Sequence, residues 1–351
     1  MKIVYDVSSL SHPRTGVGNY VVGALRGLLE AGADDVVAFA PASRGGRRLI
    51  EEALDGLDVE RALPTLPFAH GVRTLWSRVG RPAAERFLGP FDVLHFGDWM
   101  TPPQAAGLRS TMVHDLVPVR FPEWAHRKTV RMHGAKLRRL AGCDIVMTNS
   151  EFTARDVEAV LGIPSARLHV AHPGVDGGFA PEGERAELGR PYLLTVATLE
   201  PRKNLGTLLD AYRLLGSELT LAIVGGEGWG ERPELDVPGV TRLGFIANGE
   251  LPRWYRGAAA VVYPSRFEGF GLPVLEAMAS GVPVVASAHP SLDEACGEAA
   301  VRVDPESAES IAAGIELALR DRERLASLGL QHARSFSWRA CGQAHLRAWE
   351  A

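Results

Sequence analysis

Cysteine is scarce in this sequence. The 351 residues contain three, Cys143, Cys296 and Cys341, and none of them has the short spacing of a metal site or a redox pair. Isolated cysteines are typical of a reducing compartment. We therefore expect three buried, reduced thiols.

Long apolar runs are also missing. No stretch approaches the roughly 18 residues that a membrane-spanning helix requires. The first residues, Met1–Asp6, lack the hydrophobic region of a signal peptide. We therefore expect a cytoplasmic protein.

Positive charge is not in excess. The sequence has 38 Lys and Arg against 42 Asp and Glu, which gives a net charge of -4. A general nucleic-acid binder would carry a basic excess, so we expect no nucleic-acid partner. The apolar fraction of 46% is that of a globular protein, and the length suits two α/β domains.

The most informative stretch follows an apolar run, 258–263, and precedes a helical pattern that begins with proline. Gly269 and Gly271 therefore fall in a strand-to-helix turn, where glycine admits a ligand to the backbone and the helix N-terminus attracts an anion. Two carboxylates, Glu268 and Glu276, bracket this turn. An anion site flanked by hydrogen-bond acceptors suits a molecule that carries both phosphate and sugar hydroxyls.

The run Glu-Gly-Phe-Gly-Leu-Pro-Val-Leu-Glu at 268–276 resembles the signature of the family-four retaining glycosyltransferases. The resemblance implies that Glu276 holds the ribose hydroxyls of a nucleotide-sugar donor, and that Glu268 is a catalytic residue facing the donor sugar. It also implies that the backbone of the turn holds the sugar and the diphosphate, through Gly269, Phe270, Gly271 and Leu272. The alternative from the residues alone is an ordinary glycine-rich turn with two solvated glutamates.

A glycine loop, 8–18, follows the first predicted strand and precedes a helical pattern from Asn19. The same arrangement occurs in dinucleotide-binding oxidoreductases. In this sequence Val21 stands where their third glycine would fall, and no acidic residue ends the next strand. The resemblance implies instead that Gly16 and Gly18 lie near the donor phosphates and the acceptor.

Histidines end two predicted strands, His95 after 91–94 and His114 after 110–113. Ligands of an open parallel sheet bind beyond the carboxyl ends of the strands. A histidine there is more often structural, which is our interpretation of His95. His114 begins a His-Asp-Leu-Val-Pro run that resembles the family's His-Asp motif, which implies a catalytic histidine near the anomeric carbon of the donor.

Two further features concern the acceptor. Trp99 lies in a proline-rich loop, where its ring can stack on a sugar or pack beneath the loop. The predicted helix 126–140 places Arg127, Arg131 and Arg138 on one face. We interpret this face as solvated, with attraction to a phosphorylated lipid acceptor or an anionic membrane as the alternative.

Adjacent cations, Arg202 and Lys203, stand between a predicted strand and a helix, where a guanidinium fork and a point charge can hold phosphate. The alternative is a solvated basic turn. The surrounding Glu-Pro-Arg-Lys-Asn run resembles the family's diphosphate-binding motif, and Ile246 matches the stretch that lines the nucleobase pocket. These cations supply the charge of a divalent ion, and no Asp-x-Asp ends a predicted strand. We therefore expect no metal and no cofactor.

The fold class that the resemblance implies is α/β, with the GT-B arrangement of two Rossmann-like domains whose parallel sheets face each other across a cleft. We place the acceptor-binding domain at 1–173, a Gly- and Pro-rich linker at 174–190, and the nucleotide-sugar-binding domain at 191–335. The closing segment, 336–351, would return to the first domain.

The function that follows is retaining transfer of a hexose from a nucleotide sugar to a saccharide or lipid-linked acceptor. The glycine loop, the His-Asp pair and the Pro-Arg-Lys-Asn run most resemble mannosyltransferases that use GDP-mannose. Two alternatives stay open, a sugar-nucleotide epimerase of the same architecture and a non-catalytic sugar-nucleotide-binding subunit. An epimerase needs several carboxylates around the sugar, and only Glu268 is well placed. A non-catalytic subunit would have a degraded Arg-Lys pair, which is intact here.

Overall fold

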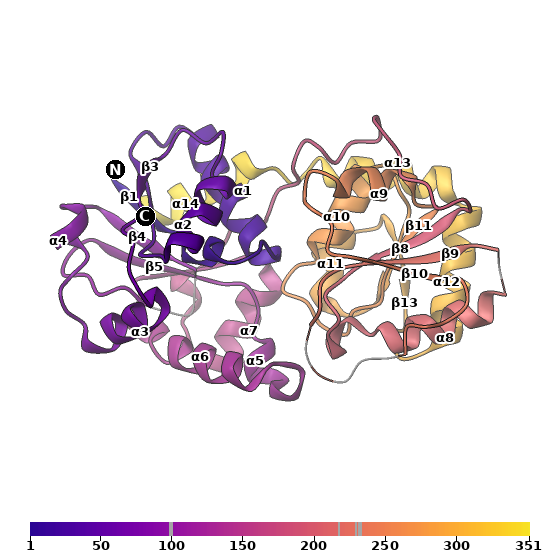
Figure 1. Cartoon of the computed structure of the whole chain (residues 1–351), viewed down its shortest axis with the longest axis horizontal. Helices are drawn as coiled ribbons and strands as arrows, with labels where there is room; N and C mark the ends of the chain where they lie inside the picture. Colours follow the sequence, from indigo (N-terminus) through magenta and orange to yellow (C-terminus); the bar gives the residue numbers. More distant parts are fainter. Residues whose placement is uncertain (98–100, 217, 229, 231–233) are drawn as a thin grey trace. The chain divides into compact units, whose positions relative to one another are not determined.

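The computed structural model describes residues 1–97, 101–216, 218–228, 230 and 234–351 (Figure 1). The predicted acceptor residue Trp99 lies outside the described residues. Contacts divide the chain into two compact units. Unit 1 contains Met1–Val119, Lys128–Gly174 and Ser337–Ala351, and unit 2 contains Arg120–Arg127 and Val175–Phe336. The short segment Arg120–Arg127 thus belongs to unit 2, although it interrupts the sequence of unit 1.

The sheet of unit 1 has seven parallel strands in the order β3-β2-β1-β4-β5-β6-β7. Its strands are β1 (Ile3–Asp6), β2 (Val36–Phe39), β3 (Glu60–Ala62), β4 (Val93–Phe96), β5 (Leu108–Val113), β6 (Ile145–Thr148) and β7 (Leu168–Val170). The inner strands are short apolar runs because a parallel sheet is covered on both faces. The two edge strands, β3 and β7, contain no buried residue and were not predicted.

The α-helices assigned to unit 1 or joined to it are α1 (Gly16–Glu30), α2 (Arg44–Ala53), α3 (Ala69–Val79), α4 (Glu85–Leu88), α5 (Val117–Arg120), α6 (Arg127–Leu137), α7 (Glu151–Leu161) and α14 (Trp338–Glu350). Two differ from their predicted bounds. Helix α1 begins at Gly16 rather than Asn19, because the Asn19 amide already donates to the carbonyl of Thr15 and closes the first turn. Helix α6 ends at Leu137, so Arg138 lies beyond it.

Helix α14 packs on α1 within unit 1 (Figure 1, yellow beside indigo). The two backbones touch at glycines. A Cβ added to Gly27 would lie 1.9 Å from the carbonyl oxygen of Trp338, and one added to Gly342 would lie 2.1 Å from the carbonyl of Gly27. Any larger residue at either position would push the helices apart. The closing helix is therefore a core element of unit 1.

The sheet of unit 2 has six parallel strands in the order β10-β9-β8-β11-β12-β13. They are β8 (Tyr192–Val196), β9 (Thr220–Val224), β10 (Val240–Gly244), β11 (Ala260–Tyr263), β12 (Val284–Ser287) and β13 (Ala300–Val303). The α-helices are α8 (Leu205–Leu215), α9 (Leu251–Gly257), α10 (Leu272–Ala279), α11 (Asp293–Cys296), α12 (Ala308–Arg320) and α13 (Arg322–Ala333). Strand β10 ends at Gly244, which has a left-handed φ of 69°, so Ile246 lies in the connection that follows the strand.

Short 3-10 helices punctuate the connections: η1 (Ser8–Ser11), η2 (Pro122–Trp124), η3 (Leu140–Gly142), η4 (Ser165–Arg167), η5 (Pro201–Lys203) and η6 (Pro290–Leu292). The segment 174–190 has no helix or strand. From Val175 onward it packs on unit 2, where Phe179 and Leu188 join the core and Arg256 donates to the carbonyls of Gly178 and Glu184. This segment is therefore held along most of its length.

Cys143, Cys296 and Cys341 are buried free thiols, as expected. Burial raises the pKa of Cys143 to about 11 and that of Cys296 to about 12, so both stay protonated at neutral pH. Within the part of the chain that the structure describes, no helix has both the length and the apolar character to cross a bilayer.

Candidate active site

The strand order of unit 2 reverses between β8 and β11, which makes this pair the topological switch point of the sheet. Ligands of open α/β sheets bind beyond the carboxyl ends of the strands at such a point. The connection after β8 carries Arg202 and Lys203, and the connection after β11 carries Glu268. Lys203 and Glu268, which are 65 residues apart in the sequence, therefore meet at one end of the sheet.

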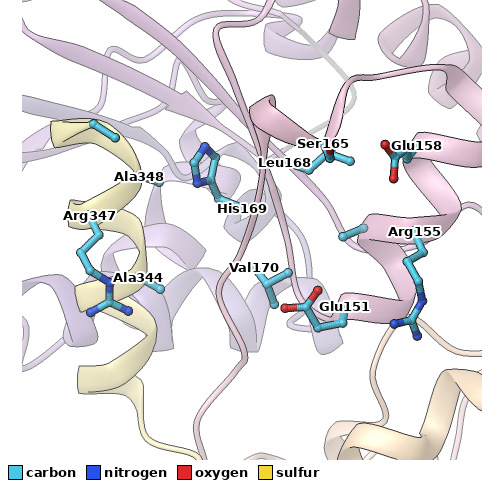
Figure 2. Close-up of a pocket in the computed structure, with 12 residues that line it drawn as sticks. Glu151, Arg155, Glu158, Ser165, Leu168, His169, Val170, Ala344, Arg347 and Ala348 are labelled. Atoms are coloured by element: carbon cyan, nitrogen blue, oxygen red, sulfur yellow. The ribbon is translucent and has the colours of Figure 1, made fainter.

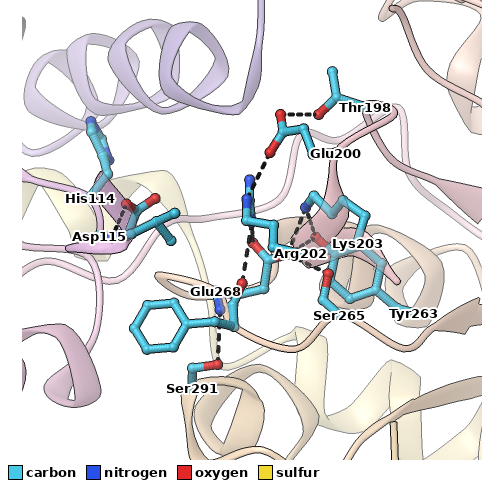
Figure 3. Close-up of polar contacts among 12 residues, drawn as sticks. His114, Asp115, Thr198, Glu200, Arg202, Lys203, Tyr263, Ser265, Glu268 and Ser291 are labelled. Carbon is cyan, nitrogen blue, oxygen red and sulfur yellow. Dashed lines mark hydrogen bonds and ion pairs between the residues drawn. The ribbon is translucent and has the colours of Figure 1, made fainter. Parts of the chain in front are cut away.

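Glu268 is the centre of a buried polar network (Figure 3). Its Oε1 atom accepts hydrogen bonds from Lys203 Nζ at 2.6 Å and Ser265 Oγ at 2.6 Å, and Tyr263 OH donates to the same atom at 2.9 Å. Its Oε2 atom accepts from Arg202 Nη1 at 2.7 Å. Both carboxylate oxygens are therefore engaged, which is more than the predicted role of facing the donor sugar requires.

A second carboxylate, Glu200, holds the other side of the guanidinium. Arg202 Nε donates to Glu200 Oε2 at 2.8 Å, and Thr198 Oγ1 donates to Glu200 Oε1 at 2.7 Å. Two cations and two carboxylates thus balance in the network (Figure 3). Arg202 and Lys203 are placed and oriented where the sequence predicted, but their charge is already compensated.

The network determines the charge of its members. Burial by itself would raise the pKa of Glu268, but the charges of Arg202 and Lys203 outweigh burial and lower this pKa to about 2. Burial also lowers the pKa of Lys203, and the charge of Arg202 lowers it further, whereas Glu268 opposes both. Glu268 is therefore an anion at any physiological pH and cannot act as a proton donor there.

The turn after Glu268 leads into helix α10. Gly271 is the residue that precedes the helix, and its φ of 105° is in the region that favours glycine. A Cβ at this position would also lie 2.5 Å from the side chain of Leu292. The amides at the start of α10 point out of the helix and favour an anion. Gly269, Phe270 and Gly271 thus lie between Glu268 and the helix, and Leu272 is the first residue of α10.

Glu276 lies inside α10 and is buried. Tyr255 of α9 donates its hydroxyl to Glu276 Oε2 at 2.8 Å. Burial raises the pKa of Glu276 to about 7, although the bond from Tyr255 lowers it. Unlike Glu268, this carboxylate has no cation among the causes of its shift. The ionised form of Glu276 is therefore disfavoured in the ligand-free protein, and hydroxyl groups that donate hydrogen bonds to it would stabilise that form.

This raised pKa predicts that a Glu276→Gln variant is more stable than the wild-type protein. A carboxyl whose pKa rises from 4.5 to about 7 on folding costs stability as the pH rises through that range. One pKa unit corresponds to about 1.4 kcal/mol, so at about pH 8 the ionised carboxylate lowers the free energy of unfolding by ~3 kcal/mol. We expect the ligand-free variant to gain most of this in urea unfolding at about pH 8 and almost none at about pH 4.

A gain that is the same at both pH values would mean that burial of an ionised Glu276 is not its source. Glu250→Gln is the matched control. Glu250 is in the same unit and its side chain is 58% exposed, so we expect no pH-dependent change.

In unit 1, His114 follows β5 and its Nε2 atom is buried with no hydrogen-bond partner among the described residues. Burial, and then the charge of Lys136, lower the pKa of His114 to about 3. Lys136 is held beside it by bonds to the carbonyls of Met112 and Gly97. The imidazole is therefore neutral at physiological pH, with one nitrogen still to be satisfied.

The other predicted residues of unit 1 are placed as follows. Gly16 and Gly18 are the first and third residues of α1 rather than part of a loop, and a Cβ at Gly16 would meet nothing within 4 Å. His95 is fully buried in the core, with Nδ1 2.9 Å from Ser110 Oγ and its ring 4.7 Å from that of Tyr5. The structure agrees with the structural interpretation of His95.

Unit 1 also has a polar pocket of about 470 Å³ between α7, β7 and α14 (Figure 2). Side chains of both signs line it, among them Glu151, Arg155, Glu158, His169 and Arg347. None of the predicted site residues lies in it. The candidate residues are therefore the switch-point side chains of unit 2 and, separately, His114 of unit 1, and none of them lines this pocket.

In the described ranges, no three His, Cys, Asp or Glu side chains gather closely enough to hold a metal ion. The expectation of metal-independent chemistry itself stays a prediction.

Sequence reasoning missed the partners of the predicted residues. Glu200, Tyr263 and Ser265 position the cations and Glu268, and Tyr255 binds Glu276. Glu200 was within the family-like run and carried a usable signal, since it lies two residues from a cation at a strand end. The tyrosines carried none, because an isolated tyrosine in an apolar stretch is more often a core residue.

Comparison with known proteins identifies the family. Residues 14–177 match the family model Glycosyltransferase Family 4, and residues 179–334 match Glycosyl transferases group 1. A D-inositol 3-phosphate glycosyltransferase of Thermomonospora curvata is 30% identical, over 96% of this chain and 92% of the relative. The chain belongs to the family-4 glycosyltransferases.

Two further proteins are similar to this glycosyltransferase over nearly their whole length. The O-antigen chain mannosyltransferase B of Escherichia coli is 29% identical over the full length of both chains. The solved structure of Anabaena HepE in complex with UDP-glucose has a TM-score of 0.72 at 17% identity, covering 99% of this chain and 98% of that one. With the two sheets described above, the predicted fold class, GT-B with two Rossmann-like domains, is confirmed.

Proposed function

We propose that this glycosyltransferase moves a hexose, with retention of anomeric configuration, from a nucleotide sugar to a hydroxyl of a saccharide or lipid-linked acceptor in the synthesis of a polysaccharide or glycoconjugate. One observation carries the proposal. At the switch point of unit 2, the Arg202–Lys203 pair, the N-terminus of α10 and the buried Glu276 are assembled together. Phosphate, sugar and ribose of one donor match these three features in turn.

The leaving group determines what the residues must do. The bond from the anomeric carbon to the diphosphate breaks, and a bond from that carbon to the acceptor oxygen forms on the same face. The proton of the acceptor hydroxyl ends on a diphosphate oxygen. Negative charge therefore grows on the diphosphate, where Arg202, Lys203 and the amides of Gly269–Gly271 stabilise it. No metal is needed in this scheme.

The ion pairs of the network mean that a donor has to displace a carboxylate before its diphosphate can reach the cations. Glu268 and Glu200 occupy the cations in the ligand-free protein. An arriving diphosphate competes with Glu268 for Arg202 and Lys203. We infer that the carboxylate of Glu268 then turns toward the sugar hydroxyls, which gives it the role that the sequence predicted.

The donor we propose is GDP-mannose, because a relative that matches over its full length is named a mannosyltransferase and the Pro-Arg-Lys-Asn run resembles that of mannosyltransferases that use GDP-mannose. A thermal-shift panel of GDP-, UDP- and dTDP-sugars tests it. A ligand at about 100 times its dissociation constant stabilises a fold by ~2.7 kcal/mol. We expect the largest shift with GDP-mannose, and a larger shift with UDP-glucose would contradict this choice.

Removing the cation pair should lower turnover more than it weakens nucleoside binding. Hydrogen bonds to charged groups contribute about 1.5–3 kcal/mol each, which for Arg202→Ala or Lys203→Ala is about 10- to 150-fold in turnover. The nucleoside has no phosphate, so its affinity should stay within about threefold. Isothermal titration with guanosine and a turnover assay check the two halves.

Arg266→Ala is the matched control for the cation pair. Arg266 is in the connection after β11 as well, but it pairs with the exposed Glu306 and not with Glu268. Its loss should change neither turnover nor guanosine binding. Equal losses of turnover and guanosine affinity in the Arg202 variant would mean that Arg202 is structural.

The stabilised Glu276→Gln variant should also bind nucleotide less well. If ionised Glu276 accepts both ribose hydroxyls, the neutral amide forfeits about 1.5–3 kcal/mol of binding to GDP. A variant that is more stable when empty and weaker in binding cannot be explained by misfolding. Unchanged affinity for GDP, UDP and dTDP would assign Glu276 another role.

Product analysis with and without an acceptor separates this proposal from its two alternatives. A transferase forms a glycosylated acceptor and releases the nucleoside diphosphate. An epimerase would interconvert sugar nucleotides without any acceptor. A non-catalytic subunit would stabilise on nucleotide and form no product.

A further inference from the structure

Helix α3 of unit 1 is apolar on two faces. Ala69, Arg73 and Trp76 face inward, and the Trp76 ring packs on Phe39 of the sheet. Val72, Leu75 and Val79 form a second stripe at the spacing of one helix face, and all three are exposed. A surface helix ordinarily has one apolar face, so the second one is without an evident role in folding.

The exposed stripe belongs to a larger apolar surface. Phe68 and Phe87, at either side of α3, are 90% and 62% exposed. Residues 68–87 thus contain half of the ten large exposed hydrophobic residues in the described part of the chain. Phe68 is also in the left-handed region with φ of 50°, a strained conformation for a bulky residue, and it holds the ring outward.

A pocket of about 410 Å³ opens beneath this surface. Leu75, Trp76, Val79 and Phe87 line it together with Leu66, and its lining is almost entirely apolar. Contiguous apolar surface of this kind marks an interaction site on a monomer. We call the exposed residues Phe68, Val72, Leu75, Val79 and Phe87 the α3 surface.

Positive charge surrounds the α3 surface. Residues 66–90 and 127–142 contain ten Lys and Arg against one acid, Glu85, although the whole chain has a net charge of -4. Residues 66–90 and 128–142 both belong to unit 1, where the end of α3 lies beside the residues that follow α6 (Figure 1). Arg139, just after α6, donates from Nη1 to the carbonyl of Ser77 in α3 at 2.9 Å and to its hydroxyl at 2.6 Å.

Lys128, Arg131 and Arg138 are exposed. An apolar centre with a border in which basic residues greatly outnumber the single acid, Glu85, therefore extends along both helices.

We propose that the α3 surface docks unit 1 on an anionic lipid bilayer. Helices that lie in a membrane interface bury an apolar face at the level of the acyl chains, with Lys and Arg at the headgroups. Each basic residue near an anionic leaflet contributes roughly 1 kcal/mol, or about fivefold in binding. A protein partner would have to be both apolar and strongly acidic to match the same surface. The inference rests on no step of sugar transfer.

Vesicle cosedimentation of the full chain tests the proposal. We expect binding to vesicles that contain one third phosphatidylglycerol, weaker binding in high salt, and little binding to pure phosphatidylcholine. The double variant Leu75→Gln/Val79→Gln should bind about tenfold less, since two apolar side chains no longer insert. Arg131→Gln should bind about fivefold less.

Matched controls come from the same chain. Leu214 in α8 is 57% exposed against 63% for Leu75, so Leu214→Gln makes the same change on another helix and should leave binding unaltered. Arg48→Gln, at an arginine of α2 that is 75% exposed, is the control for Arg131→Gln. All these residues are exposed, and unchanged circular dichroism would verify folding.

Several outcomes would overturn the proposal. Absence of wild-type binding, equal binding to both vesicle compositions, or equal losses in Leu75→Gln/Val79→Gln and Leu214→Gln would each do so. A lipid-free dimer that the Leu75→Gln/Val79→Gln variant converts to monomer would assign the α3 surface to a second copy of the chain instead. Because no sugar nucleotide is present, failure here leaves the proposed transfer untouched.

Discussion

A Glu268→Gln variant is expected to be about 3–5 kcal/mol less stable than the wild-type protein, the usual effect of leaving a buried charge without its partner. Lys203 is buried, and the neutral amide of the variant would leave its charge without a carboxylate partner. Its Nζ atom would keep the bond that it donates to the hydroxyl of Tyr263 at 2.6 Å. Arg202 would keep Glu200. Urea unfolding at neutral pH measures the loss.

The pH dependence of the wild-type protein gives an independent measure of the same pair. The pKa of Glu268 is lowered from 4.5 to about 2, so the stability it contributes is complete above pH 4.5. This contribution is lost as the pH falls from 4.5 toward 2. The difference between the wild-type protein and the Glu268→Gln variant should therefore shrink in that window and stay constant above it.

Two controls separate the buried pair from surface effects. Glu306→Gln removes the exposed partner of Arg266 and should cost less than about 1 kcal/mol. The double variant Glu268→Gln/Lys203→Met removes both charges, and should be more stable than Glu268→Gln alone. A Glu268→Gln variant as stable as the wild-type protein would contradict the account of the network.

Inorganic pyrophosphate extends the test to function. Without the charge of Glu268, Lys203 has no competing carboxylate and Arg202 has only Glu200, so the Glu268→Gln variant should bind pyrophosphate more tightly while losing transfer. A purely structural Glu268 would instead weaken both.

A His114→Ala variant is expected to lose about 10²–10⁴ in turnover, the range for a lost catalytic contact, while nucleotide affinity stays within roughly threefold. The proposed donor residues are in unit 2 and His114 is in unit 1, so its loss should leave nucleotide binding intact. Its neutral imidazole, with Nε2 unsatisfied, is suited to accept or donate a hydrogen bond to a hydroxyl of the reacting sugar. Steady-state kinetics and calorimetry with GDP measure the two quantities.

His95→Ala is the comparison that decides the assignment. His95 lies inside the neighbouring strand β4, where it is fully buried between Tyr5, His345 and Trp349. Its loss should lower thermal stability and leave the turnover of the folded fraction much nearer to normal. If His95→Ala lost most of its turnover and His114→Ala kept near-normal turnover, our assignment of the catalytic histidine to the end of β5 would be wrong.

The pH profile gives a further check on His114. Its pKa of about 3 means that it does not titrate near neutrality in the ligand-free protein. The turnover of the wild-type enzyme should therefore show no inflection from this histidine near its ordinary pKa of 6.5.

The core strands of both sheets were predictable because each is a short apolar run between turn-forming residues. The edge strands β3 and β7 were not, since a three-residue strand without buried side chains has no periodicity to detect. Helix α1 began earlier than predicted because a glycine at the first turn is compatible with a helix as well as with a loop. Such boundaries depend on capping bonds that residue type does not determine.

For the site, the sequence indicated which residues carry charge but not which of them form ion pairs. Arg202 and Lys203 were predicted as a phosphate clamp, and the structure adds that Glu268 and Glu200 already hold them. The pairs with Glu268 join the connections after β8 and β11, so they depend on strand order, whereas Glu200 and Arg202 lie in one connection. The contrast between Glu268 and Glu276 could not be predicted either, because the two side chains are identical, are both buried, and differ only in their neighbours.

The packing of α14 on α1 has a consequence for biosynthesis on the ribosome. Unit 2 is made almost entirely from one continuous segment, Val175–Phe336, and can fold as soon as this segment has emerged. Unit 1 has to wait, because α14 is translated only after that whole segment. Until then the face of α1 that carries Gly23 and Gly27 is uncovered, so the nascent N-terminal half is the part most dependent on chaperones.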